Sequence, residues 1–312
     1  METVIKETET LKGKDCLTLA DFSTEELLSL LDLAVKLKSE KFSPLLMGKS
    51  LGMIFEKPST RTRVSFEVGM TQLGGHALYL NGNDLQLGRG ETIADTAKVL
   101  SQYVDAIMIR TFEQAKVEAL AEAAEVPVIN GLTNEFHPCQ VLADLLTIQE
   151  KCGGFTGKTL AYVGDGNNMA HSLMIGAAKV GMHCTIASPP GYQPDPEITK
   201  KADQLAAETG AVIKVTDDPY DAVQFADVVY TDVWASMGDD QNDARLDALM
   251  PFQVNAALLL HAQKNPIFMH CLPAHRGEEV TAEIIDGPNA VVFDQAGNRL
   301  HAQKALLASL IK

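Results

Sequence analysis

Short apolar segments along the first half of the chain alternate with longer stretches whose apolar residues recur every three or four positions. Residues 50–55 form one such apolar segment, which ends before Pro58. Beyond it, Phe66, Met70 and Leu73 have the spacing of one helix face. The pattern therefore predicts a strand, then a polar turn that caps a helix, and then the helix itself.

The same alternation continues along the chain and divides it in two. Residues 151–158 contain three glycines and predict a junction, after which the alternation restarts. Strands are expected at 50–55, 77–80, 105–109 and 127–129, and again at 159–163, 183–187, 212–215, 227–231 and 266–269. A helix capped by Ser23 with Glu26 precedes them, and an apolar helix at 300–311 follows them.

This order predicts an α/β protein with two doubly wound domains, each with a central, mainly parallel sheet flanked by helices. The expected domains are 1–150 and 151–297, and a terminal helix at about 298–312 is expected to pack back on the first domain. Ligands of open α/β sheets bind at the carboxyl ends of the strands, so the residues just after each strand are the candidates for function.

The residues after the first strand favour an anion. Ser59, Thr60, Arg61, Thr62 and Arg63 follow it directly, at the predicted start of a helix. Helix N-termini present unpaired amide N–H groups and positive potential, and arginine matches phosphate oxygens with two parallel donors. With Lys57 nearby, the two arginines are expected to form a cationic pocket. The chain has no G-x-x-x-x-G-K-[ST] segment, which favours a small phosphate compound over a nucleotide.

Other predicted strand ends also carry chemically useful side chains. Arg110 ends one strand, His137 and Gln140 open the helix after another, and Asp232 and Cys271 follow two strands of the second half. The turn from Gly164 to Asn168 lacks the third glycine of a dinucleotide fingerprint. Its asparagines suit a small polar ligand.

Two glycine-containing loops complete the set of candidates. The loop at 81–91 carries Gln86, and either contact with a neighbouring molecule or an ordinary surface loop would account for its glycines. The loop with Ser236, Met237 and Gly238 is expected to close over a site.

Composition narrows the function and the location. The formal net charge is −15, which disfavours nucleic acid and anionic membrane surfaces as partners. Five cysteines without paired metal spacing are expected to be reduced thiols. No apolar stretch approaches the length of a membrane span, and the N-terminus has no secretory pattern, so a cytoplasmic location is expected.

Four of these segments together resemble the aspartate/ornithine carbamoyltransferase family. They are Ser-Thr-Arg-Thr-Arg at 59–63, His-Pro-Cys-Gln at 137–140, Asp232 with Ser-Met-Gly at 236–238, and His-Cys-Leu-Pro at 270–273. The resemblance covers essentially the whole chain in matching order. The Ser-Met-Gly loop and the cysteine at 271 are similar to the ornithine branch, since an aspartate enzyme is expected to have proline in place of that cysteine.

The resemblance implies carbamoyl phosphate on the first domain, L-ornithine on the second, and an active site in the interdomain cleft. The carbamoyl phosphate set implied by the family is Ser59, Thr60, Arg61, Thr62, Gln86, Arg110, His137, Gln140, Cys271, Leu272 and Arg299. The ornithine set is Asn168, Asp232, Ser236 and Met237, and the catalytic set is Arg110, His137, Asp232 and Cys271. Gln86 is implied to reach the site of a neighbouring subunit in a homotrimer.

The activity implied is transfer of the carbamoyl group to the side-chain amine of ornithine, giving citrulline and phosphate without a metal or an organic cofactor. Three alternatives stay open. The acceptor could be putrescine or acetylornithine, the reaction could serve arginine breakdown rather than arginine biosynthesis, or the turn at Gly164 could make the protein a non-catalytic phosphate- or dinucleotide-binding module.

Overall fold

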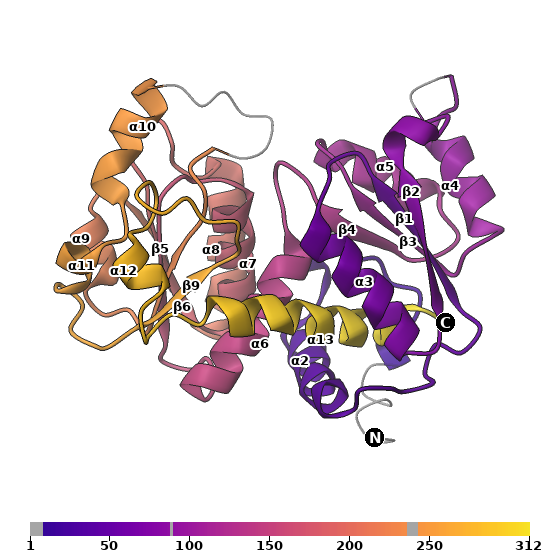
Figure 1. The fold of residues 1–312 in the computed structure, drawn as a ribbon, viewed down its shortest axis with the longest axis horizontal. Helices are drawn as coiled ribbons and strands as arrows, with labels where there is room; N and C mark the ends of the chain where they lie inside the picture. The colour runs from indigo at the N-terminus through magenta and orange to yellow at the C-terminus, as the bar shows by residue number, and fades with distance from the viewer. Residues whose placement is uncertain (1–8, 88–89, 236–242) are drawn as a thin grey trace. The chain divides into compact units, whose positions relative to one another are not determined.

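Parallel strands form two separate sheets among the residues that the structure describes, which are 9–87, 90–235 and 243–312. The structure is a computed structural model (Figure 1). Its residues divide into two units, one of Met1–Leu146 with Gly297–Lys312 and the other of Thr147–Ala296. The chain passes from unit to unit inside α6 (Pro138–Cys152) and inside α13 (Val292–Leu310). Each unit is described by itself below.

The sheet of the first unit has the strand order β2-β1-β3-β4, and all neighbouring strands run parallel. The strands are β1 (Ser50–Phe55), β2 (His76–Asn81), β3 (Ala106–Arg110) and β4 (Val128–Leu132). All four agree with the strands expected from the sequence to within three residues at each end. The predicted parallel sheet of this unit is therefore confirmed.

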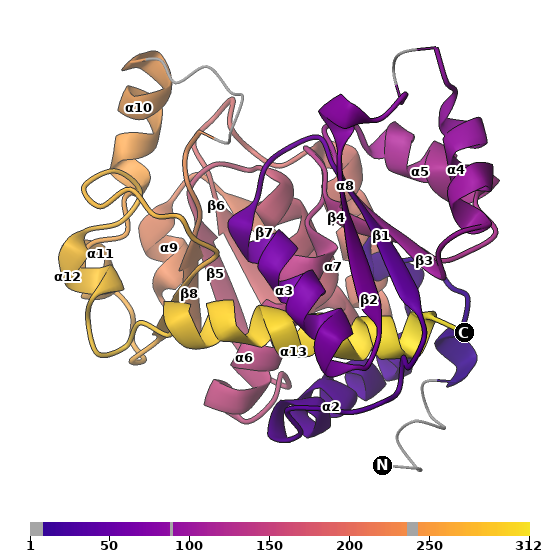
Figure 2. The same cartoon turned by 45° about the vertical axis from the view of Figure 1, so that its right-hand side comes forward.

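Helices cover both faces of the first sheet. Side chains of α4 (Ile93–Ser101) and α5 (Gln114–Ala123) pack with alternate residues of the strands, among them Ile54, Ile107 and Ile109. The other face carries α3 (Thr60–Gln72), which packs through Gly69 against side chains of α13 (Figure 2). Helix α2 (Thr24–Ser39) begins at Ser23 with the capping box that the sequence predicts.

The sheet of the second unit has the order β7-β6-β5-β8-β9 and is also parallel throughout. The strands are β5 (Thr159–Val163), β6 (His183–Ala187), β7 (Ile213–Thr216), β8 (Val228–Thr231) and β9 (Ile267–His270). Each one was expected from the sequence to within one residue at each end. The strands β5, β8 and β9 are almost entirely buried, as is typical of parallel strands covered on both faces.

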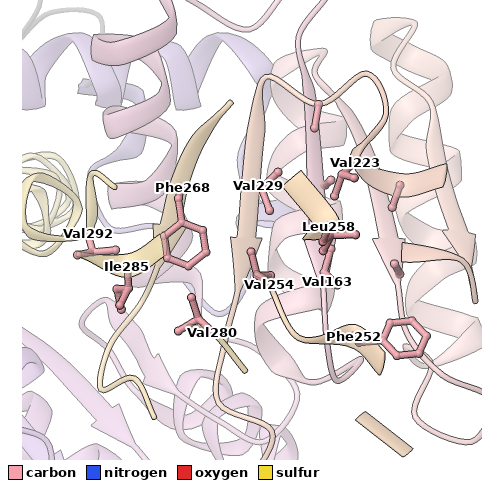
Figure 3. Close-up of a cluster of buried hydrophobic side chains, with 14 residues drawn as sticks. Val163, Val223, Val229, Phe252, Val254, Leu258, Phe268, Val280, Ile285 and Val292 are labelled. Carbon is pink, nitrogen blue, oxygen red and sulfur yellow. The ribbon is translucent and has the colours of Figure 1, made fainter. Parts of the chain in front are cut away.

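One face of the second sheet is closed by short helices. Val163, Val229 and Phe268 of three strands meet side chains of α9 (Pro219–Val223), α11 (Ala256–Leu259) and α12 (Ala282–Ile285) (Figure 3). The crossover helices α7 (Asn168–Val180) and α8 (Pro196–Thr209) pack together outside this cluster. The remaining short elements are η1 (Glu9–Leu11), η2 (Leu19–Asp21), η3 (Gly82–Asp84), α10 (Asp243–Leu249) and η4 (Met250–Phe252).

Each sheet has one switch point, where two neighbouring strands connect onward to opposite sides of the sheet. In the first unit β1 is followed by β2 on one side and by β3 on the other, and in the second unit β5 lies between β6 and β8. At such a switch point the loops after two neighbouring strands diverge and leave a crevice at the carboxyl edge. The topology therefore singles out the residues after β1 and β3, and those after β5 and β8.

One prediction about the elements was wrong. The sequence predicts the terminal helix at 300–311, with residues 294–299 before it, whereas α13 already begins at Val292. Gly297 lies inside the helix, where glycine is unfavourable by about 1 kcal/mol relative to alanine, so local propensity hides the true start. No helix of the described residues has the length and apolar character needed to cross a membrane.

Candidate functional site

Ser59 ends the turn after β1 and caps α3. Its Oγ accepts a hydrogen bond from the backbone N–H of Thr62 at 3.2 Å and donates to the Thr62 hydroxyl at 3.1 Å. Thr60, Arg61 and Thr62 form the first turn of the helix. The predicted cap is confirmed, and the turn presents amide N–H groups and positive potential at the carboxyl edge of the sheet.

Arg299, from the middle of α13, connects this turn to α6. It is 2 % exposed, and its guanidinium donates to the Thr62 hydroxyl at 3.2 Å, to Gln140 Oε1 at 2.7 Å and to Gln303 Oε1 at 3.1 Å. The Gln140 amide in turn donates to Asp144 at 2.8 Å. Because its donors are held by three elements, the guanidinium is a fixed positive charge beside the N-terminus of α3.

His137 lies directly before α6, near the positive charges of three arginines. It is buried, and burial together with the positive charges of Arg299, Arg110 and Arg61 holds the pKa of its imidazole well below the ordinary value. The imidazole is therefore neutral at neutral pH. It can donate a hydrogen bond to an oxygen without adding a charge to the cluster.

A β-bulge sets the position of Arg110. Between β3 and β4 the pairing shifts, so that Ile109 pairs with Asn130 but Arg110 pairs with Leu132. The extra residue is Gly131, where a Cβ would lie 2.5 Å from the sulfur of Met108. A side chain at this position would therefore force the Met108 side chain to move, and glycine leaves room for it at the bulge beside Arg110.

Arg63 and Lys57 were expected in the cationic pocket, and both contact side chains outside it. Arg63 is exposed, bonds Glu67 at 2.9 Å and lies over the ring of Tyr79 at 3.9 Å. Residues two apart on a helix point in different directions, so Arg61 and Arg63 do not share one pocket. The prediction for Arg63 was wrong. Lys57 is buried and donates to Asn134 at 2.5 Å.

The remaining predicted residues of the carbamoyl phosphate set lie elsewhere. Gln86 is exposed and lies two residues after the end of η3. Cys271 and Leu272 belong to the second unit. The structure thus brings Ser59, Thr60, Arg61, Thr62, Arg110, His137, Gln140 and Arg299 together in one cluster, which we call the cationic cluster.

In the second unit the predicted residues meet at the ends of neighbouring strands. Thr231 of β8 pairs with His270 of β9, so Asp232 and Cys271 follow side by side. The Cys271 thiol donates to one Asp232 carboxylate oxygen at 2.9 Å. Asn168 opens α7 after β5 and, like Asp232, is largely buried. We call Asn168, Asp232 and Cys271 the carboxylate–thiol cluster.

His270 and Glu279 support this cluster and were missed from the sequence. The His270 Nδ1 accepts the backbone N–H of Leu272 at 2.9 Å, and its Nε2 lies 3.2 Å from a carboxylate oxygen of Glu279. Both residues are fully buried. They hold the backbone after Cys271, where Leu272 has a φ of 57°, in the left-handed region that most residues avoid. In the sequence His270 was noted only as part of the His-Cys-Leu-Pro segment, without a role, and Glu279 has no signal.

Two groups of side chains in this part of the chain have ligand atoms close enough together to hold a metal ion. Ligand atoms of Asp232, His270 and Cys271 lie within 4.8 Å of one another, as do those of His275, Glu278 and Glu279. In the first group both imidazole nitrogens of His270 already face Leu272 and Glu279, and the Cys271 thiol faces Asp232. A metal ion bound by this group would have to replace these hydrogen bonds at the same ligand atoms.

Trp234 and Arg245 flank residues 236–242. Arg245 donates to the carbonyl oxygen of Trp234 at 2.5 Å and to the carboxylate of Asp165 at 2.6 Å. The chain on both sides of the segment is therefore tied to the turn after β5. Two predicted site residues, Ser236 and Met237, lie outside the described residues.

The turn after β5 lacks the geometry of a dinucleotide site. Gly166 donates its N–H to the carbonyl oxygen of Tyr192 at 2.7 Å, and a Cβ on Gly166 would lie 2.3 Å from the backbone nitrogen of Pro194. In a dinucleotide-binding fold this glycine lets a pyrophosphate approach the backbone. Here the protein's own backbone at residues 192–194 occupies the space next to Gly166, and this disfavours the dinucleotide-binding alternative.

Comparisons with known proteins agree with this arrangement. Residues 14–150 match the aspartate/ornithine carbamoyltransferase, carbamoyl-P binding domain, and residues 156–310 match the Asp/Orn binding domain of the same family. An ornithine carbamoyltransferase of Anoxybacillus flavithermus is 66% identical over 307 residues, which cover 96% of this chain and 98% of the relative. One of Bacillus thuringiensis is 60% identical over 302 residues, covering 97% and 96%.

Solved structures give the same result. Ornithine carbamoyltransferase from Pyrococcus furiosus superposes with a TM-score of 0.94 at 57% identity, covering 96% of this chain and 98% of that one. The enzyme from Gloeobacter violaceus superposes with a TM-score of 0.87 at 49% identity, covering 96% and 99%.

The fold and its two clusters define a two-domain α/β protein with a cationic cluster on one parallel sheet and a carboxylate–thiol cluster on the other. Within this class, the chain belongs to the aspartate/ornithine carbamoyltransferase family.

Proposed function

We propose that the protein is an ornithine carbamoyltransferase, which transfers the carbamoyl group of carbamoyl phosphate to the side-chain amine of L-ornithine. The curated relatives and the solved structures described above carry this name at up to 66% identity over nearly the full chain. The neutral amine nitrogen forms a bond to the carbonyl carbon, the bond from that carbon to the phosphate oxygen breaks, and the leaving phosphate takes up the proton that the nitrogen loses. Citrulline and phosphate are the products.

The cationic cluster is the donor site of this proposal. The phosphate lies at the N-terminus of α3, where Ser59, Thr60 and Thr62 supply hydroxyl and amide donors and Arg61 supplies positive charge. Negative charge grows on the phosphate oxygens as the carbamoyl carbon is lost from them. Donors that are already in place stabilise this charge without reorganising during the reaction.

Arg110, His137 and Gln140 hold the carbamoyl end. The carbonyl oxygen gains negative charge as the amine attacks, and the neutral imidazole of His137 and the guanidinium of Arg110 can donate to it. Arg299 fixes Gln140 and Thr62 in place and adds positive charge beside both ends of the substrate. Cys271 and Leu272 complete the carbamoyl contacts from the second domain.

The carboxylate–thiol cluster is the acceptor site. An amine must be neutral to attack, and an acceptor that holds one of its hydrogens orients the lone pair. Asp232 is such an acceptor, and the Cys271 thiol beside it is a second polar group that the amine would contact. Asn168, Ser236 and Met237 bind the amino-acid head group of ornithine. This chemistry requires that both clusters contact one substrate pair.

The observation that carries the donor half of the proposal is the buried guanidinium of Arg299, which is hydrogen-bonded to Thr62 and Gln140 beside the N-terminus of α3. It suits a dianionic leaving group with a polar carbonyl attached. A colorimetric citrulline assay with carbamoyl phosphate tests the whole proposal. Ornithine is the expected acceptor, and putrescine, acetylornithine and aspartate are expected to give no product. Turnover of one of those three amines in place of ornithine overturns the assignment.

Several finer features belong to the same proposal. The donor domain comprises residues 1–150 with the terminal helix, and the acceptor domain comprises 151–297. The protein acts in the cytoplasm, in arginine biosynthesis, as a homotrimer in which Gln86 reaches a neighbouring active site. The exposure of Gln86 on the first unit supports a contact with another subunit. Neither nucleic acid nor membrane is a partner, in keeping with the net charge of −15.

A further inference from the structure

Asn167 lies between the end of β5 and the start of α7 and is not a member of either predicted substrate set. Its side-chain oxygen accepts hydrogen bonds from the backbone N–H groups of Met169 at 2.9 Å and Ala170 at 3.4 Å. It is therefore the N-cap of α7. The Tyr162 hydroxyl is a third partner of the same oxygen, at 3.3 Å.

These three contacts determine which way the amide faces. Backbone N–H groups can only donate, so the atom that meets them is the oxygen. Burial, followed by the negative charge of Asp232, raises the pKa of Tyr162 well above its ordinary value, so its hydroxyl keeps the proton that it donates. The amide nitrogen of Asn167 must then point the opposite way.

On that opposite side is Asp232. The Asn167 nitrogen donates to one carboxylate oxygen at 3.2 Å, and the Cys271 thiol donates to the other at 2.9 Å. Each oxygen thus has one fixed donor, and rotation of the carboxylate would break both hydrogen bonds. The lone pairs that remain on the two oxygens point in directions set by Asn167 and Cys271.

We propose that Asn167 is a positioning residue: it uses the N-terminus of α7 as a fixed support from which it orients the Asp232 carboxylate toward the acceptor amine. The inference rests on the proposed function, since it concerns the acceptor site of that reaction. Asn167 does not touch the substrate in this account. It acts through Asp232, and it has no part in the binding of carbamoyl phosphate.

Two substitutions separate the cap from the donor. Asn167→Ser keeps an oxygen that caps α7 but removes the amide nitrogen that reaches Asp232, and Asn167→Ala removes both. We expect both variants to lower kcat/KM for ornithine by about tenfold or more, the effect of losing one hydrogen bond to a charged group. We expect KM for carbamoyl phosphate to stay within about twofold of wild type, because one hydrogen bond to Asp232 leaves the cationic cluster unchanged. Both variants lose the hydrogen bond to Asp232, and Asn167→Ala, which also loses the cap of α7, is expected to lower the unfolding midpoint further than Asn167→Ser.

A matched control comes from the same unit. Asp218 caps α9 through Tyr220 and Asp221 and lies outside both clusters. Asp218→Ala is expected to lower the unfolding midpoint without changing kcat/KM for ornithine. If Asn167→Ser keeps wild-type kinetics while Asn167→Ala loses activity in step with its stability, Asn167 is a helix cap only and the inference fails. A wild-type protein that makes no citrulline would instead contradict the proposed function.

Discussion

Which residues form the candidate site could be predicted from their chemistry and their positions after strands. The directions in which their side chains point could not. Ser59, Arg110 and Asp232 are recognisable because they come just after buried strands. Arg63 has the same sequence context as Arg61 and yet pairs with Glu67, because two residues along a helix correspond to roughly 200° of rotation. Arg299 was identified only by resemblance, and its burial among three elements has no local sequence signal.

His137 leads to a prediction about pH. Its pKa in the folded protein lies below the ordinary value of about 6.5, so the folded state binds fewer protons than the unfolded state between these two values. Stability is therefore expected to fall as the pH is lowered through about 6.5, by at most about 1.4 kcal/mol per pH unit. Urea unfolding between pH 5 and pH 7.5 measures this slope.

His137→Asn is the matched variant for this measurement, since asparagine is a polar residue favoured directly before a helix and does not titrate. Its stability is expected to depend less steeply on pH than that of wild type over the same range. Equal slopes for the two proteins would show that His137 is not held neutral by burial and its neighbouring arginines.

At the scale of elements, the period of apolar residues located every strand, and the caps of α2 and α3 were recognisable from Ser23 and Ser59. The start of α13 was not, because Gly297 and Asn298 interrupt a helix that tertiary packing maintains. The bulge at Gly131 was also missed. The register shift depends on the pairing of β3 with β4, and the packing of Met108 against Gly131 has no signal in the local sequence.

The two caps give a matched pair of variants. Ser59→Ala and Ser23→Ala each remove an N-cap hydrogen bond, and each is expected to lower the free energy of unfolding by about 1 kcal/mol. Only Ser59 lies at the proposed phosphate site, so only Ser59→Ala is expected to raise KM for carbamoyl phosphate, by about tenfold. Chemical denaturation and steady-state kinetics check the two effects. A similar rise in Ser23→Ala would mean that the kinetic effect is one of stability.

At the scale of the whole molecule, each sheet places part of its cluster at its own switch point: Ser59 and Arg110 at β1/β3 in one unit, and Asn168 and Asp232 at β5/β8 in the other. Two α/β domains were predictable because strands and helices alternate on both sides of residues 151–158. Contacts such as Asn167 to Asp232 were not, since they join residues 65 positions apart. Topology, not local pattern, brings them together.

Mixed oligomers test the proposed role of Gln86. Subunits with Gln86→Ala and subunits with Arg61→Ala are each expected to have low activity, and dissociating and reassembling them together is expected to restore part of it. Some sites of the mixed trimer would then combine an intact Gln86 of one subunit with an intact Arg61 of another. Citrulline formation before and after mixing is the measurement.

A control pair uses Arg61→Ala with His137→Ala, two residues whose interaction lies within one chain. Mixing these subunits is expected to restore nothing. If the Gln86→Ala and Arg61→Ala mixture also shows no gain while trimers are seen by light scattering, Gln86 does not act on a neighbouring site.

The most direct test of the account follows the atoms of the reaction. Carbamoyl phosphate labelled with carbon-13 and ornithine labelled with nitrogen-15 at the side-chain amine are incubated with the protein, and mass spectrometry and a phosphate assay follow the products. We expect citrulline that carries both labels, with one phosphate released for each molecule formed. Phosphate release without doubly labelled citrulline would contradict the claim that the two clusters serve one carbamoyl transfer.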